Sequence, residues 1–173
     1  IFNNSSHNLW ARTAFIEAEN LVLGGSGSAS LYCNLGGNYR FTHCTIANFW
    51  NNGFRTSAAL VLDNFAQVSE TNTFSSDLIQ ADFRNCIIDG NSQIELALKS
   101  DEASLFNYNF TNCMIQFNDF SEQFTGNPLY NFKDEAKYMG ILLNLNADFF
   151  FSARNDFRIG LESEAIGNGD LEF

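Results

Sequence analysis

A six-residue pattern that occurs three times constrains the fold of this chain more than any other feature. The copies lie at residues 41–46 (F-T-H-C-T-I), 83–88 (F-R-N-C-I-I) and 110–115 (F-T-N-C-M-I). A weaker fourth copy at residues 18–23 (A-E-N-L-V-L) keeps the Asn and the apolar alternation but has Leu21 in place of Cys. Phe, Cys and Ile alternate with polar or variable positions, which is the period of β-strands and not of helices.

One polar residue interrupts the alternation in each copy: Asn20, His43, Asn85 and Asn112. Asn tolerates the left-handed backbone conformation better than other non-Gly residues, so a bend between two short strands is expected there. Repeats of this length bury their apolar faces only by stacking on one another. We therefore predict an all-β fold, a parallel β-helix (solenoid), right-handed as parallel crossovers usually are, with these side chains in a hydrogen-bonded ladder.

The interval from His43 to Asn85 is 42 residues, against 23 from Asn20 to His43 and 27 from Asn85 to Asn112. It holds either two plain coils or one coil with insertions. We prefer one coil, because residues 59–62 are the only further inward strand in the interval. Residues 51–56 and 67–76 are polar and are predicted as loops.

The chain has four cysteines. Cys44, Cys86 and Cys113 hold the same place in successive copies, so their side chains should stack with parallel directions. A disulfide needs two side chains that approach with a suitable torsion, which such a stack does not supply. We predict a column of free thiols that act as small apolar groups, with Cys33 unmatched. No C-x-x-C spacing supports zinc.

Composition excludes several functions. With a net charge of −11 and 9 Lys+Arg, the chain lacks the basic face that nucleic acids require, and the same charge disfavours anionic lipid. No apolar run approaches the roughly 20 residues of a membrane span. The 19 Phe are expected to stack inside the coils.

At 173 residues the chain is predicted to be a single domain. Residues 1–120 are expected to form regular coils, and residues 121–173 an irregular coil and a C-terminal cap, giving about four to five coils. The apolar residues of the segment 156–169 should close the last coil. The first residues match the middle of a later copy, so we expect the C-terminal piece of a longer solenoid.

The repeated F-x-N-C-x-I-x-x-N units, followed by D-F-R-I-x-x-x-S-x-A-I-G-x-G at residues 156–169, resemble the right-handed parallel β-helix repeat proteins of bacterial surfaces, in the pectin-lyase-like superfamily. The resemblance covers nearly the whole chain and is most specific in the final segment. Two positions depart from the pattern. Glu164 stands where the family motif has Pro, and His43 stands in place of the ladder Asn.

This resemblance implies secretion, an extracellular or bacterial cell-surface location and a carbohydrate-rich setting. It implies no specific reaction, because the superfamily includes both enzymes and non-enzymes. Family lyases use an Arg or Lys base, often with calcium held by Asp and Glu. The chain's candidates for such roles are Asp63, Asp82, Asp89, Glu95, Arg55, Arg84 and Lys99, for which the competing interpretation is a solvated surface.

Loops offer the more informative candidates, since solenoid insertions tend to project from one face and carry binding. Residues 49–55 combine aromatic rings, amides and a guanidinium group, which suit sugar rings and their hydroxyls. We predict ligand contacts at Trp50, Phe54 and Arg55. In the alternative, Trp50 and Phe54 fold back to cover the flank of the coil.

Three functional hypotheses follow. The first is a non-catalytic secreted or cell-surface module that binds carbohydrate or a protein partner through loops on one face. The second is a polysaccharide lyase or glycoside hydrolase whose groove lies mostly on upstream coils, and the third is a structural spacer. We identify no catalytic residue, and His43 is assigned to the ladder. No cofactor or metal is predicted, since calcium needs about six converging oxygens and no D-x-D-x-D spacing is present.

Overall fold

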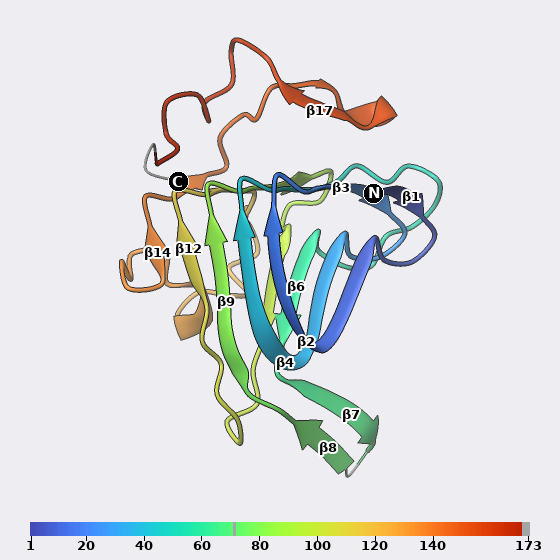
Figure 1. Cartoon of the computed structure of the whole chain (residues 1–173), viewed down its shortest axis with the longest axis vertical. Coiled ribbons are helices and arrows are strands. Elements are labelled where there is room, and N and C mark those ends of the chain that lie inside the picture. Colours follow the sequence, from blue (N-terminus) through green and yellow to red (C-terminus); the bar gives the residue numbers. More distant parts are fainter. Residues whose placement is uncertain (71, 171–173) are drawn as a thin grey trace.

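A computed structural model of the chain describes residues 1–70 and 72–170, and these residues form an all-β structure without an α-helix. Two parallel sheets run through it, and the chain passes from one sheet to the other in each repeat (Figure 1). In the described part of the chain, no helix has the length and apolar character needed to cross a membrane.

Sheet A takes one short strand from each repeat, and all of its neighbours pair in parallel. Its strands, in spatial order, are β1 (Phe2–Asn4), β3 (Val22–Ser26), β5 (Thr45–Asn48), β10 (Ile87–Gly90), β13 (Met114–Ile115) and β15 (Leu142–Leu143).

Sheet B is also parallel and includes two long strands that bend. Its members are β2 (Leu9–Glu19), β4 (Leu31–Thr42), β6 (Leu60–Asp63), β9 (Leu78–Arg84), β11 (Leu96–Lys99), β12 (Asn109–Thr111) and β14 (Tyr138–Met139). The first half of β4 pairs with β6 and its second half with β9. The bends divide sheet B into two portions that point in different directions. We call them the first face (9–12, 31–34, 60–63, 96–99) and the second face (14–19, 37–42, 78–84, 109–111, 138–139).

Glycine makes the bend in β4 feasible. Gly36 has φ +69°, and a Cβ atom there would lie 2.4 Å from the carbonyl oxygens of both Ser76 and Asp77. Only a residue without a side chain fits this left-handed position against another backbone. In β2, Thr13 takes the corresponding bend with φ +46°.

The second face and sheet A meet at the interrupting residues of the repeated pattern. Asn20, His43, Asn85 and Asn112 all have left-handed backbones, with φ between +49° and +54°. The backbone N–H of each donates to a carbonyl of the next repeat, at Thr42, Arg84, Thr111 and Met139. The four residues thus lie one above another at a single corner. The Asn85 amide, however, exchanges hydrogen bonds with the backbone of Asp170, because the C-terminal segment crosses this corner.

An aromatic column fills the space between the sheets. Phe41, Phe83, Phe110 and Tyr138 come from successive strands, and their neighbouring ring centroids are 5.2, 5.0 and 5.6 Å apart with nearly parallel planes. Phe41 pairs directly with Phe83 in the sheet. The 42-residue interval therefore contains one repeat with insertions, as predicted.

The four cysteines are free and buried. In the repeated cysteines Cys44, Cys86 and Cys113, each Sγ donates to two backbone carbonyls. Cys86, for example, donates to the carbonyls of Phe41 at 3.4 Å and Arg84 at 3.2 Å. Burial raises the pKa of the Cys86 thiol, and the hydrogen bond with Cys86 together with burial raises the pKa of Cys44. The raised pKa values of Cys44 and Cys86 favour the thiol form, which is less reactive than the thiolate.

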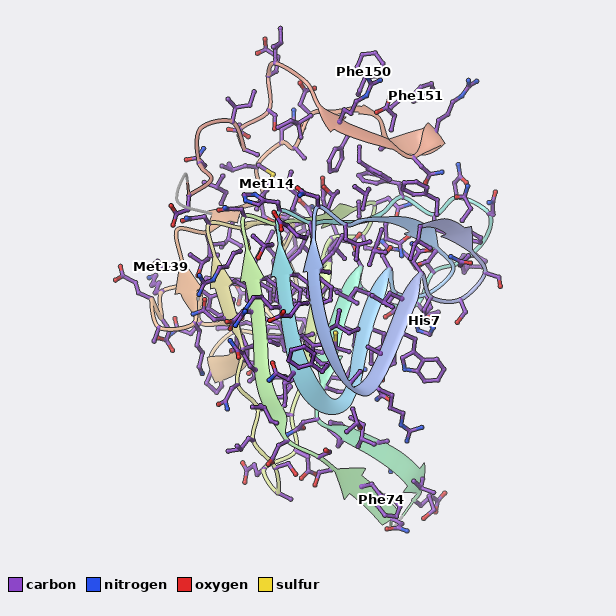
Figure 2. The ribbon with its side chains drawn as sticks, in the orientation of Figure 1. His7, Phe74, Met114, Met139, Phe150 and Phe151 are labelled. Atoms are coloured by element: carbon purple, nitrogen blue, oxygen red, sulfur yellow. The ribbon has the colours of Figure 1, made fainter. Side chains whose placement is uncertain are left out.

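The predicted loop at residues 67–76 is wrong in its secondary structure. Strands β7 (Phe65–Ser69) and β8 (Asn72–Ser75) form an antiparallel hairpin that projects from the body, with Phe74 on it (Figures 1 and 2). Thr71, within the predicted loop, lies outside the described residues. Apolar and polar residues alternate in residues 66–69 (A-Q-V-S) and 72–75 (N-T-F-S), which favours strands once the two segments pair.

The segment that contains η1 covers the edge of β11, which is an outermost strand of the first face. The 3₁₀ helix η1 (Pro128–Tyr130) places the Tyr130 hydroxyl on the edge of β11, where it accepts from the Leu98 N–H at 2.7 Å and donates to the Leu98 carbonyl at 3.2 Å. Phe117 and Phe124 pack against the Tyr130 ring, and Phe132 packs against Phe117.

The segment 156–169 was expected to close the last coil, but it packs along sheet A instead (Figure 1). Strands β16 (Phe149–Phe151) and β17 (Asp156–Ile159) are antiparallel and are joined by η2 (Ser152–Arg154). Phe157 lies against Phe2 and Phe49, over Gly24, which has no side chain in the way. Phe150 and Phe151 point away from the body (Figure 2).

Candidate binding groove on the first face of sheet B

The first face is built from a second short pattern, an apolar–variable–apolar–polar unit in four strands. The units are L-W-A-R (9–12), L-Y-C-N (31–34), L-V-L-D (60–63) and L-A-L-K (96–99), and they pair in register. Because side chains alternate along a strand, the first and third residues enter the core. The second and fourth residues form two rows on the outside: Trp10, Tyr32, Val61 and Ala97, beside Arg12, Asn34, Asp63 and Lys99.

The polar row, together with Trp10 and Tyr32, lines a groove of about 560 Å³. Its floor includes Trp10, Tyr32 and Asp63, and its wall is the first part of the β7–β8 hairpin, from Phe65 to Val68. The insertion that follows β6 therefore turns a flat sheet face into a recess. We call this recess the sheet groove.

An aromatic platform occupies one row of the sheet groove. The rings of Trp10 and Tyr32 are 6.1 Å apart and inclined by only 5°. The His7 ring lies 5.4 Å from both of them, and burial lowers the pKa of His7. Trp10 remains 58% exposed, so a flat ring faces solvent beside polar groups.

The Asp63 carboxylate holds the Tyr32 ring of this platform in place. The carboxylate is 3% exposed and accepts hydrogen bonds from the Tyr32 hydroxyl at 2.5 Å, the Asn34 amide at 2.8 Å and the Leu35 N–H at 2.7 Å. Burial and the hydrogen bond to Asp63 raise the pKa of Tyr32. Asp63 is thus a positioning group whose oxygens are already engaged by the protein.

Other polar side chains of the sheet groove are available to a ligand. Arg12, Gln67 and Lys99 form no side-chain hydrogen bond or ion pair with any residue that the structure describes. Arg12 and Lys99 stand on the two outermost strands of the polar row, β2 and β11. The groove therefore offers an exposed ring on β2 and a cationic donor at each end of the polar row.

The predicted contacts Trp50, Phe54 and Arg55 lie elsewhere. The indole of Trp50 is half-buried, and its backbone is held by Asn48 and Asn91. Phe54 is fully exposed. These three residues do not line the sheet groove.

Arg55 is committed to an internal ion pair with Glu95, in which the two side chains are 4% and 0% exposed. Its guanidinium group donates to both Glu95 oxygens and also to Asn91 and Ser92. Glu95 accepts further hydrogen bonds from the N–H groups of Ala59 and Ser92. Burial raises the pKa of Glu95 to about 7, while Arg55 opposes this shift.

The acidic residues considered for a catalytic or calcium-binding role are dispersed. Asp63 lies on the first face, Asp82 on β9 of the second face, Asp89 on β10 of sheet A and Glu95 in the ion pair. Among residues 1–70 and 72–170, no group of three or more His, Cys, Asp or Glu side chains is arranged to hold a metal ion.

The sheet groove was not among the predicted sites, although the sequence carries a signal for it. The four L-x-x-x units repeat the same alternation as the longer pattern, and their outer positions hold the Trp, Tyr, Arg, Asp and Lys of the groove. Their alignment requires the strand register, because the intervals between units vary from 22 to 36 residues.

In comparisons with known proteins, no protein-family model, no curated protein and no solved structure matches this chain.

Proposed function

We propose that this chain is a non-catalytic carbohydrate-binding module and that the sheet groove is its binding site. The stacked Trp10–Tyr32 pair carries the proposal. An exposed aromatic face flanked by hydrogen-bond donors matches the two surfaces of a sugar ring, one formed by C–H groups and the other by hydroxyls at the edge. Arg12, Gln67 and Lys99 supply donors that have no partner among the described residues, and Asp63 holds the Tyr32 ring in place.

The groove chemistry favours binding over hydrolysis. Glycoside hydrolases use a pair of carboxyl groups about 5–10 Å apart. Among the described residues that line the sheet groove, Asp63 is the single carboxylate, and three protein donors occupy it. A general acid or nucleophile would need that carboxylate free to meet the substrate.

We further propose that the fold is a right-handed parallel β-helix of the pectin-lyase-like kind and that it acts outside the cell. Support comes from the parallel pairing of both sheets, from the shared left-handed corner and from the repeat pattern. The buried free thiols are compatible with an oxidising setting, because no thiolate is exposed to react.

A glycan array tests the function. Wild type is expected to bind one or more polysaccharides. Trp10→Ala should lower the affinity by roughly 3–10-fold, in line with about 0.5–1.5 kcal/mol for an aromatic contact. Phe15→Ala is the matched control, because Phe15 is also an exposed ring on β2 but lies outside the sheet groove.

Two results contradict the proposal: no glycan retained by wild type, or equal affinity of wild type and Trp10→Ala for every glycan retained. Far-ultraviolet circular dichroism of the variants ensures that a loss of binding reflects the groove and not unfolding.

A further inference from the structure

A second recess lies at the opposite end of the first-face strands from the β7–β8 hairpin. It has a volume of about 460 Å³ and is formed by residues 55–58 and 92–94 together with Asn118, Phe120, Ser121 and Gln123. The first two segments precede β6 and β11, whereas the hairpin follows β6. We call this recess the loop cleft.

The rim of the loop cleft is held rigidly. Arg55 lines it, and the ion pair with Glu95 ties residues 55–58 to residues 92–95. The bridge between Ile94 and Phe117 ties the segment that follows Phe117 to residues 92–94. A preformed cleft loses little conformational entropy when it binds a ligand.

The loop cleft presents neutral polar groups. The side-chain amides of Gln93, Asn118 and Gln123 have no hydrogen-bond partner among the described residues, and Phe120 is 80% exposed. Arg55 is the one charged side chain among the described residues of the lining, and Glu95 neutralises it. Amides both donate and accept, as vicinal hydroxyls do, and the ring offers a stacking face.

An apolar cluster that is largely closed to solvent lies between the loop cleft and the sheet groove, with Ala58 9% and Val61 4% exposed. Ala58 belongs to the cleft and Tyr32 to the groove, and both pack in one cluster with Val61 and Ala97. Val61 and Ala97 are the outward residues of β6 and β11 between the two recesses. At about 3.3 Å per residue, a four-residue strand separates them by roughly 13 Å.

We propose that the loop cleft binds neutral sugar units of the same glycan chain that occupies the sheet groove, so that a long chain crosses the first face along its strands. The proposal rests on the proposed carbohydrate function. A ligand that reaches both recesses gains from the effective concentration of its second part, whereas a short ligand occupies the sheet groove alone.

Binding of short and long oligosaccharides of one glycan, measured by calorimetry, tests this. Phe120→Ala and the double variant Asn118→Ala/Gln123→Ala should lower the affinity for the longest oligosaccharide by roughly 3–10-fold. Both should leave the affinity for the disaccharide unchanged. Trp10→Ala should weaken binding at every length. Phe54→Ala is the control, because Phe54 is an exposed ring outside the lining of the cleft. It should change the affinity for neither the disaccharide nor the longest oligosaccharide.

The outcomes separate the two proposals. The loop cleft proposal is wrong if the cleft variants match the affinity of wild type at every oligosaccharide length, or if they lower the affinity equally at every length. If Trp10→Ala weakens binding in the same experiment, the sheet groove proposal stands. If wild type binds no oligosaccharide, both proposals fall.

Discussion

Arg55 and Glu95 are 40 residues apart in the chain, yet the Arg55 Nη1 atom lies 2.7 Å from the Glu95 Oε2 atom in an ion pair closed to solvent. Each partner leaves a buried charge behind if the other is removed. At pH 8, where Glu95 is ionised, Arg55→Ala is expected to lower the free energy of unfolding by about 3–5 kcal/mol. Urea unfolding measures this loss. Arg40→Ala, which breaks the exposed pair with Glu17, should cost about 1 kcal/mol or less, and equal losses would contradict the assignment.

The same carboxyl group predicts a pH dependence of stability. Burial raises the pKa of Glu95 from an ordinary value of 4.5 to about 7. The unfolded chain therefore releases this proton first, and the contribution of Glu95 to stability is full below pH 4.5 and declines as the pH rises through about 7. The free energy of unfolding of wild type should fall relative to Glu95→Gln over this range. A relative rise would show that Arg55 outweighs burial.

The aromatic column predicts a large loss at its centre. Phe83 stacks on Phe41 and Phe110 and is fully buried. Phe83→Ala should lower the free energy of unfolding by about 3–5 kcal/mol, because it removes buried surface and leaves a cavity. Thermal unfolding should show a matching fall in the midpoint. Phe15→Ala removes an exposed ring and should stay within about 0.5 kcal/mol of wild type.

Two glycines separate steric overlap from conformational strain. Gly36→Ala places a Cβ atom against the carbonyls of Ser76 and Asp77, whereas Gly53→Ala meets nothing within 4 Å. Both have positive φ, so both variants are strained. In denaturant unfolding, Gly36→Ala should lower the free energy of unfolding by about 1–3 kcal/mol more than Gly53→Ala does. The reverse order would place the bend of β4 elsewhere.

The two free cations of the sheet groove predict how binding depends on ligand charge. Arg12→Ala and Lys99→Ala should each weaken binding of a glycan that carries carboxylate or sulfate groups by about 2–5-fold, and added salt should shrink the difference. Binding of neutral glycans should weaken less and without a dependence on salt, because only hydrogen bonds to hydroxyls are lost. Lys133→Ala makes the same charge change outside the groove. If it weakens binding equally, net charge and not groove position is responsible.

The repeated hexapeptide was sufficient to predict strands, corners and the aromatic column, because these features depend on local alternation and on the backbone preference of one residue. Asn20, Asn85 and Asn112 sit at left-handed corners as their residue type favours, and His43 takes the same backbone. The single repeat between His43 and Asn85 was also predictable from the scarcity of inward strands there.

The candidate site was not predictable in the same way. Composition pointed to Arg55 as a surface ligand contact, but its side chain forms a buried ion pair with Glu95. The residues of the sheet groove lie in four units separated by unequal insertions, so only the register of β2, β4, β6 and β11 brings Trp10, Tyr32, Asp63 and Lys99 together.

The sequence by itself thus determined which residues face inward and where the chain turns, since those properties are set by neighbours a few positions away. Only the tertiary structure decided which insertion becomes the wall of a groove, which charge is buried and which face the C-terminal segment covers. Each of these depends on contacts between residues far apart in the chain, and the lengths of irregular insertions hide those contacts from any local pattern.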